Sequence, residues 1–161
     1  MNRLLLFLFL SIPLFGYSQY TGATPWENCF GINCSCEGYP ENGYLVGCSK
    51  IKVSTSTSPV VAIVKRYGNV LKHAYISAES SYLFEVPDGT YQVFFYYGDI
   101  WNSRKKMNSD ECPGIYGGFT KNESVSKDSP ISLESQRMTY KLTRVSNGNF
   151  SPKSSSLNEA L

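Results

Sequence analysis

The middle of the chain carries short apolar stretches, some alternating with polar residues and some continuous, with turn residues between them. Residues 50–54 alternate polar and apolar side chains, which is typical of a strand with one buried face. Residues 60–64 (Val-Val-Ala-Ile-Val) form a continuous run that is too short for a helix, so they predict a strand buried on both faces. Gly68 and Asn69 predict a two-residue hairpin turn after it, because both residue types tolerate positive φ.

The same strand pattern continues to residue 145. Residues 70–76 and 82–86 have strand character, and the Pro-Asp-Gly sequence at 87–89 is the clearest turn. Further strands are expected at 90–97, 115–120, 124–127 and 138–145. No stretch keeps an apolar period of 3.6 residues. The pattern predicts an all-β fold, a single antiparallel β-sandwich of about seven short strands over residues 50–145.

Aromatic side chains concentrate in one of these strands and in the residues after it. Residues 91–97 are apolar on both faces, whereas a strand with one face in water alternates with polar residues. The favoured interpretation is a central strand covered on both sides. The alternative is a platform of rings at the sheet edge that stacks on a sugar or docks a partner, with the loop 98–114 setting its specificity. The candidate ligand-binding residues of that platform are Tyr96, Tyr97, Trp101 and Tyr116.

Two stretches of the chain resemble known families. Residues 84–93 (Phe-Glu-Val-Pro-Asp-Gly-Thr-Tyr-Gln-Val) resemble a hairpin of prealbumin-like, carboxypeptidase-regulatory-like sandwich domains, in which the tyrosine after the turn packs into the core. This likeness covers residues 60–97. The chain from residue 19 also resembles small, uncharacterised secreted β-sandwich proteins of Gram-negative bacteria, through its His-Ala-Tyr-Ile, Gly-Thr-Tyr-Gln, Phe-Phe-Tyr-Tyr-Gly and Asn-Gly-Asn-Phe stretches. That resemblance implies secretion and one compact domain, and it transfers no functional residue.

The first residues follow the order of a secretory signal. A basic residue, Arg3, precedes an apolar run at 4–15, and small residues at 16 and 18 mark a cleavage site. A transmembrane anchor is the alternative, but the run of about a dozen residues is shorter than the roughly 20 that a bilayer needs. We therefore expect residues 1–18 to be a signal peptide, the mature chain to begin at Gln19, and the protein to be secreted or periplasmic.

Five cysteines follow the expected cleavage site, and four of them lie in the segment 19–49. They are Cys29, Cys34, Cys36, Cys48 and Cys112. An oxidising compartment makes disulfides the default, and cross-links suit a segment with little regular apolar pattern. Pairing of Cys34 with Cys36 would strain the ring, and the odd count leaves one thiol over, so several connectivities stay open. We expect one bridge to join Cys112, which lies on a long loop, to the N-terminal segment.

The chain offers few groups for catalysis or for binding a metal. Its cysteines lack the paired C-x2-C spacing of a zinc site, and the acidic residues Asp99, Asp110 and Glu111 lack the pattern of a calcium loop. His73 is the sole histidine; it lies mid-strand, and no nucleophile-elbow pattern surrounds any serine. We therefore predict no cofactor, no metal site and no enzymatic activity. A small hydrolase that uses His73 is the least favoured alternative.

Charge narrows the choice of partner. The chain has 15 basic and 13 acidic residues, a formal net charge of +2, which provides no electrostatic footprint for nucleic acid or an anionic membrane. After Gln19 no apolar run is long enough to span a membrane. Residues 146–161 are polar and are expected to form a loose tail.

These patterns together predict a secreted or periplasmic, non-enzymatic binding module. Its aromatic surface would contact a glycan, a peptide or a protein, and the sequence leaves the choice open. The alternative is a structural subunit of an envelope or extracellular assembly. In that case the same aromatic residues would form an interface in a homo-oligomer or with another subunit.

Overall fold

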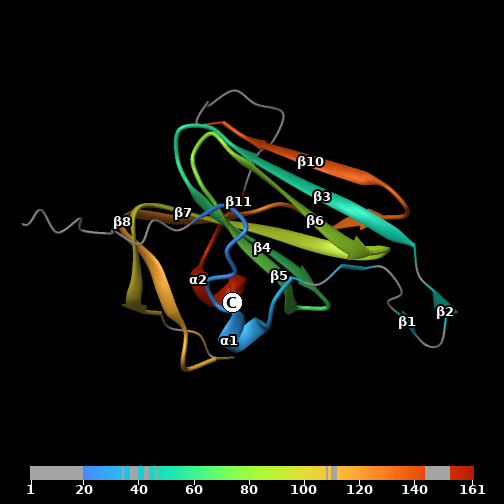
Figure 1. The fold of residues 1–161 in the computed structure, drawn as a ribbon, viewed down its shortest axis with the longest axis horizontal. Coiled ribbons are helices and arrows are strands. Elements are labelled where there is room, and N and C mark those ends of the chain that lie inside the picture. The colour runs from blue at the N-terminus through green and yellow to red at the C-terminus, as the bar shows by residue number, and fades with distance from the viewer. Residues whose placement is uncertain are drawn as a thin grey trace, which may run out of the picture.

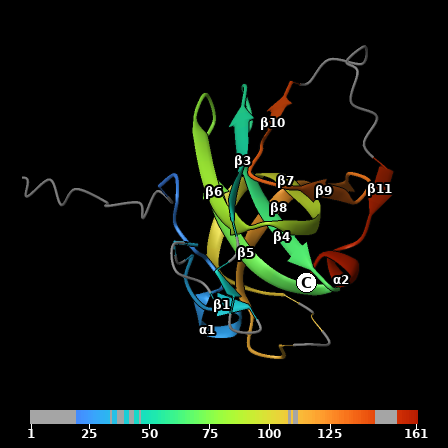
Figure 2. The same cartoon turned by 90° about the vertical axis from the view of Figure 1, so that its right-hand side faces the viewer.

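Most of the described strands belong to two β-sheets that face one another (Figures 1 and 2). A computed structural model of the protein describes residues 20–33, 35–36, 40–41, 44–45, 47–107, 109, 112–143 and 153–161. The expected signal peptide, the expected start at Gln19, Cys34, Asp110, Glu111 and residues 144–152 lie outside the described residues. Within the described ranges, no helix is long and apolar enough to cross a membrane.

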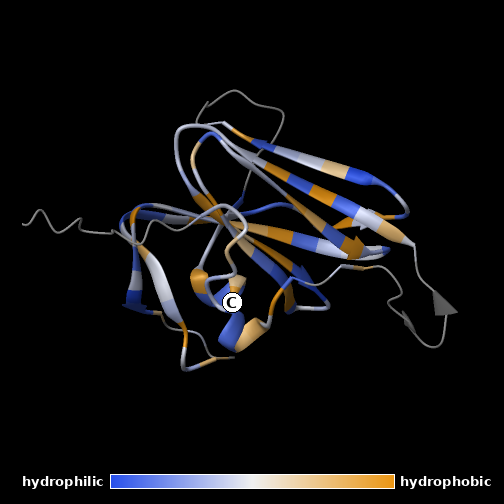
Figure 3. Ribbon diagram, in the orientation of Figure 1, coloured by the Kyte–Doolittle hydropathy of each residue, from blue (hydrophilic) through white to orange (hydrophobic). Residues whose placement is uncertain are grey.

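The smaller sheet has three strands, in the order β10-β3-β6. They are β3 (Cys48–Thr55), β6 (Ser81–Pro87) and β10 (Arg137–Leu142). More buried and more exposed side chains alternate along these strands, and Figure 3 shows the matching alternation of hydropathy. β3 pairs antiparallel with β6 and parallel with β10. The predicted all-β sandwich is confirmed, and it includes this one parallel pair.

The larger sheet has six strands among the described residues; five follow the order β11-β8-β7-β4-β5, in which neighbours pair antiparallel, and β9 pairs with β7 off this path. These five strands are β4 (Val60–Arg66), β5 (Asn69–Ile76), β7 (Gly89–Lys106), β8 (Tyr116–Lys127) and β11 (Lys153–Ser155). β9 (Ile131–Leu133) pairs with the start of β7. β1 (Pro40–Glu41) and β2 (Tyr44–Leu45) form a separate two-stranded sheet.

β7 and β8 are longer than the sequence predicted. β7 continues through the first part of the expected loop 98–114, because it pairs with β8 beyond the aromatic residues, for example at Asp99 and Lys121. The strands expected at 115–120 and 124–127 are the two parts of one strand, β8. Pairing with a distant partner, rather than local propensity, keeps these polar residues in strands.

The turn between β4 and β5 lies one position earlier than predicted. Its two central residues are Tyr67 and Gly68, with φ of 53° and 83°, and Arg66 pairs with Asn69 across it. Positive φ at both central residues is the geometry of a tight two-residue hairpin. The turn therefore presents a tyrosine at its tip, where the sequence alone suggested an asparagine.

The two faces of the larger sheet lie in two different cores. The first core lies between the sheets and includes Ile51, Phe84, Phe95 and Tyr140. The second core lies on the opposite face of the larger sheet. It consists of Ala23, Trp26, Val61, Ile63, Tyr75, Phe94, Tyr96, Met107, Ile115, Phe119, Ala160 and Leu161. The prediction that residues 60–64 are buried on both faces is confirmed, since all five are fully buried.

The N-terminal segment covers the second core and the edge of β5. It contains α1 (Glu27–Phe30), directly preceded by Trp26, which is fully buried and donates its indole N–H to the Gly117 carbonyl at 2.9 Å. Gly22 donates to the Tyr75 carbonyl at 2.8 Å, and the Tyr75 N–H donates to the Ala23 carbonyl at 2.9 Å. These bonds occupy part of the β5 edge, which would otherwise offer unpaired backbone groups.

Residues 153–161 are structured, which corrects the expectation of a loose tail at 146–161 for this part of it. Residues 153–161 form β11 and α2 (Leu157–Ala160), and Ala160 and Leu161 are buried in the second core. Ser156 caps α2 by accepting the Glu159 N–H. A few apolar side chains in a polar stretch are enough to dock it, because the face that they cover is itself apolar.

Two disulfides are formed. Cys29 pairs with Cys112, which confirms the predicted bridge from Cys112 to the N-terminal segment, and Cys36 pairs with Cys48. The first bridge joins α1 to the segment between β7 and β8 across 83 residues. It therefore fastens the covering segment of the second core to the sheet that it covers.

Candidate functional site

A hollow with many hydroxyl side chains in its lining lies where β7 and β8 meet the connection after β3 and the end of β10. We call it the Tyr97 pocket; its volume is about 300 Å³. Its lining consists of Ser56, Ser58, Tyr97, Gly98, Asp99, Asn122, Ser124, Ser126, Leu142 and Thr143. Five hydroxyl side chains from three segments, one amide and one carboxylate thus surround a single aromatic ring.

A close approach of β7 to β8 positions this lining. A Cβ at Gly98 would lie 2.3 Å from the Cβ of Phe119, so only glycine allows the two strands to come together here. The pairing register shifts between Tyr97 and Asp99, which marks an irregularity of the ladder at the pocket. Bulges of this kind turn side chains away from the regular strand directions.

Two residues beside the pocket have left-handed backbone conformations. Ile100 has a φ of 57° and Asn122 a φ of 51°. Asparagine tolerates this region, but a β-branched residue there is strained. The Asn122 amide donates to Asp99 Oδ2 at 2.6 Å, so the amide and the carboxylate hold each other in place. Strain of this kind persists where the surrounding structure enforces it, often at a binding site.

Two hydroxyls of the pocket, those of Tyr97 and Ser126, are affected by burial. Burial raises the pKa of Tyr97, and the Ser126 hydroxyl acts in the opposite direction. That Ser126 hydroxyl is itself buried and has no partner with hydrogen-bond geometry in the described part of the chain. Ser126 therefore interacts with Tyr97 without full hydrogen-bond geometry, and a bound ligand or water would complete its hydrogen bonding.

The structure brings only one of the four predicted contact residues into this pocket. Tyr97 is half-buried and lines it. Trp101 is half-buried on the second-core side, in edge contact with Tyr75 and Phe119. Tyr116 is 51% exposed at the start of β8 and is not part of the lining. The predicted platform of four rings is therefore not assembled.

The prediction for Tyr96 is wrong, because Tyr96 has no exposed surface. Its hydroxyl donates to Glu123 Oε2 at 2.5 Å and accepts the Phe119 N–H at 2.9 Å. Burial, together with the neighbouring Glu123 carboxylate, raises its pKa. Tyr96 belongs to the second core, as the interpretation of a strand covered on both sides implies.

Sequence reasoning missed the hydroxyl and amide groups of the pocket. Serines and threonines are scattered over the whole chain, and no local pattern separates those at 56, 58, 124 and 126 from the rest. The strand register, which places β7 residues 94–97 opposite β8 residues 124–127, brings them together. The sequence pattern around Asp99 bears only on calcium binding, whereas the structure gives its carboxylate an asparagine amide as partner.

His73 is a buried structural residue. Its Nε2 accepts the main-chain N–H of Trp26 at 3.0 Å, and its ring stacks on the indole ring of Trp26 with centroids 5.5 Å apart. Desolvation by burial lowers its pKa to about 4, so the ring is neutral at neutral pH. Asn33 bonds the backbone of the same residue through both its amide nitrogen and its amide oxygen. The partner of the imidazole is thus a backbone N–H, and none of these contacts is catalytic in character.

Among the described residues, no group of three or more histidine, cysteine, aspartate or glutamate side chains is placed to hold a metal ion. Comparisons with protein-family models, with curated proteins and with solved structures found no match to this chain. The resemblances to prealbumin-like domains and to small secreted bacterial proteins stay predictions. The function is therefore argued from the chemistry of the pocket.

Proposed function

We propose that this protein is a secreted or periplasmic, non-enzymatic binding module that holds a neutral saccharide in the Tyr97 pocket. The observation that carries the proposal is the composition of the lining, in which one tyrosine ring stands among five hydroxyls, an amide and a carboxylate. The two disulfides are compatible with the oxidising compartment that this proposal requires.

The chemistry of a sugar matches these groups. The C–H face of a pyranose packs against an aromatic ring, while its hydroxyls need both donors and acceptors. Serine and threonine hydroxyls provide both, and the Asp99 carboxylate only accepts. The Asn122–Asp99 bond holds two of these groups before a ligand arrives, which reduces the entropy lost on binding.

A glycan array with the purified protein, followed by calorimetric titration of the best neutral saccharide, tests the proposal. Asp99→Asn keeps the shape of the side chain and removes its charge; we expect at least a tenfold loss of affinity with little change in stability. Glu134→Gln, a change of the same kind at an exposed position outside the pocket, is the matched control and should bind normally. The proposal fails if no neutral glycan binds or if Asp99→Asn binds as the wild type does.

The structural-subunit alternative has one observation in its favour. Ile100 and Tyr116, on the paired strands β7 and β8, are large apolar side chains that are 60% and 51% exposed. Sedimentation of the purified protein across a range of concentrations tests this alternative. A dimer or larger species that Tyr116→Ser dissociates would favour the alternative, whereas a monomer at all concentrations would count against self-assembly.

A further inference from the structure

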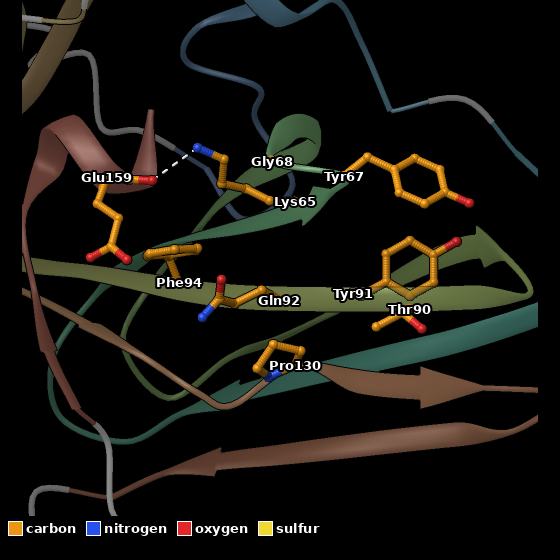
Figure 4. A pocket seen from close by; sticks show the side chains of 9 residues that line it. All are labelled: Lys65, Tyr67, Gly68, Thr90, Tyr91, Gln92, Phe94, Pro130 and Glu159. Atoms are coloured by element: carbon orange, nitrogen blue, oxygen red, sulfur yellow. Dashed lines mark hydrogen bonds between the residues drawn. The ribbon is translucent and has the colours of Figure 1, made fainter.

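A second hollow lies at the end of the β4–β5 hairpin, beside the start of β7 (Figure 4). We call it the Lys65 pocket; its volume is about 490 Å³, and it shares no lining residue with the Tyr97 pocket. Figure 4 shows Lys65, Phe94 and Glu159 at one side of it, and the rings of Tyr67 and Tyr91 at the other. Pro130 closes it from below in that view. The lining therefore combines aromatic rings with one buried cation, Lys65, and one carboxylate, Glu159.

The ammonium group of Lys65 bonds a main-chain carbonyl, and the Glu159 carboxylate acts on it only from beyond ion-pair distance. Lys65 is only 8% exposed, and its Nζ donates to the main-chain carbonyl of Glu159 at 2.8 Å. No carboxylate among the described residues lies within ion-pair distance of it. Glu159 is the nearby candidate, but its Oε1 pairs with Lys127 and its Oε2 accepts the Ser155 hydroxyl at 2.7 Å. A buried ammonium with N–H groups to spare is a site for an anion.

The rings of the pocket suit a flat apolar group. Phe94 is 1% exposed, and the ammonium groups of Lys65 and Lys127 lie 5.8 Å and 6.0 Å from its ring centroid. Tyr67 is 78% exposed at the tip of the hairpin, in a left-handed conformation that is unfavourable for tyrosine. The Arg66 guanidinium lies 5.0 Å from the centroid of the Tyr67 ring and helps to hold it.

The Glu159 carboxylate favours an anion with a single negative charge. It lies close to Lys65 while it pairs with Lys127, so it would repel a dianion such as phosphate from the ammonium. A carboxylate meets this condition and binds an ammonium at short range. The ring next to it would be a separate part of the same ligand.

We propose that the Lys65 pocket binds a ligand that carries one carboxylate attached to an aromatic ring. The carboxylate accepts from the Lys65 ammonium, and the ring packs between Tyr67 and Pro130. A free aromatic acid and a peptide that ends in an aromatic residue share this chemistry. The site is independent of the saccharide proposal, since the two pockets have no residue in common.

Four small probes test the proposal by NMR titration of the purified protein. Phenylacetate stands for a free acid and N-acetyl-phenylalanine for a peptide end, while N-acetyl-phenylalanine amide lacks the charge and acetate lacks the ring. We expect at least one of the two aromatic acids to saturate shifts of the Gly68 and Gln92 amides. The amide and acetate should bind at least tenfold more weakly. The tighter of the two acids identifies the source of the ligand.

Variants then assign the interaction to its residues. Lys65→Met keeps the apolar stem over Phe94 and should lose at least tenfold in affinity for the acid. Tyr67→Ala, at an exposed position that does not support the fold, should lose severalfold. Lys141→Met, a matched change on the exposed face of β10, should bind as the wild type does. Equal binding of acid and amide, no saturable shift with either acid, or unchanged binding by Lys65→Met would each overturn the proposal.

Discussion

The two cores of this protein share one sheet but differ in how the chain builds them. The first core is closed by strands between residues 48 and 142, whose side chains alternate in register. The second core is closed by segments from both ends of the chain. These segments reach the sheet through long-range hydrogen bonds, such as the bond from Trp26 to His73, 47 residues apart, and the bond from Lys65 to Glu159, 94 residues apart. Phe95 and Phe94, adjacent in sequence, point into the first and the second core respectively. A sheet face can thus be buried by pieces that have no strand pattern of their own.

The largest changes in stability should come from replacing one buried aromatic side chain in each core by alanine. Phe95→Ala and Trp26→Ala should each cost about 3 to 5 kcal/mol in the free energy of unfolding, because both side chains are fully buried. Denaturant titration measures that loss. Hydrogen exchange then separates the cores: Trp26→Ala should speed exchange of the Tyr75 amide, which bonds to Ala23, more than that of amides in β3. Equal acceleration in both sheets would show that the two cores open as one unit.

The two disulfides should differ in how much they stabilise the fold, and the bridge to the second core should contribute more. Replacing Cys29 and Cys112 by serine opens a loop of 83 residues, and the chain-entropy relation gives a loss of about 4.5 kcal/mol. Replacing Cys36 and Cys48, which are 12 residues apart, should cost about 3 kcal/mol by the same relation. Thermal unfolding of the two double variants compares them. A smaller effect at Cys29 and Cys112 would contradict the role of that bridge as the fastening of the second core.

The second core should also be the pH-sensitive one. The unfolded chain protonates His73 near pH 6.5, but the folded chain does so only near pH 4, so stability falls as the pH drops between these values. The loss should be about 2 kcal/mol between pH 7 and pH 5 and about 3 kcal/mol in full. The rings in contact with His73, those of Trp26 and Phe30, do not titrate.

Denaturant titrations at pH 7 and pH 5 measure this loss, with His73→Gln as the comparison. The glutamine keeps an acceptor for the main-chain N–H of Trp26 but does not titrate, so the variant should lose little stability between pH 7 and pH 5. The stabilisation from Asp88, whose pKa is lowered chiefly by the hydrogen bond from Ser49, is present at both pH 7 and pH 5 and is lost only below the ordinary pKa of an aspartate. A wild-type stability that does not change from pH 7 to pH 5 would rule out a neutral, buried histidine.

The smallest effect concerns the cap of α2. Ser156→Ala removes the acceptor for the Glu159 N–H and should cost about 1 kcal/mol. Ser154→Ala, on exposed β11, has no such role and should change the stability by less than about 0.5 kcal/mol. Chemical unfolding of both variants makes the comparison. Equal losses of stability in the two variants would mean that the cap does not help to hold residues 153–161 on the second core.

Much of the fold was predictable because its signals are local. The continuous run at 60–64, the alternation at 50–54 and the turn at 87–89 each depend on neighbouring residues alone, and each corresponds to an observed element. The extension of β7 and the docking of 153–161 depend on partners far along the chain, so no window of sequence carries them. The same holds for Tyr96, whose aromatic character fits a platform and a core equally well.

What the sequence by itself determined is the β character of the chain, the double burial of its central strands and the bridge that ties Cys112 to the N-terminal segment. Tertiary structure alone decided which aromatic residues are exposed, because exposure depends on what covers a face and not on the residue beneath it. The tertiary structure also decided which side chains line the Tyr97 pocket and the Lys65 pocket. Hydroxyls from separate strands meet only when the register of β7 and β8 is set, and the Lys65 ammonium meets Glu159 only when the chain returns across the sheet.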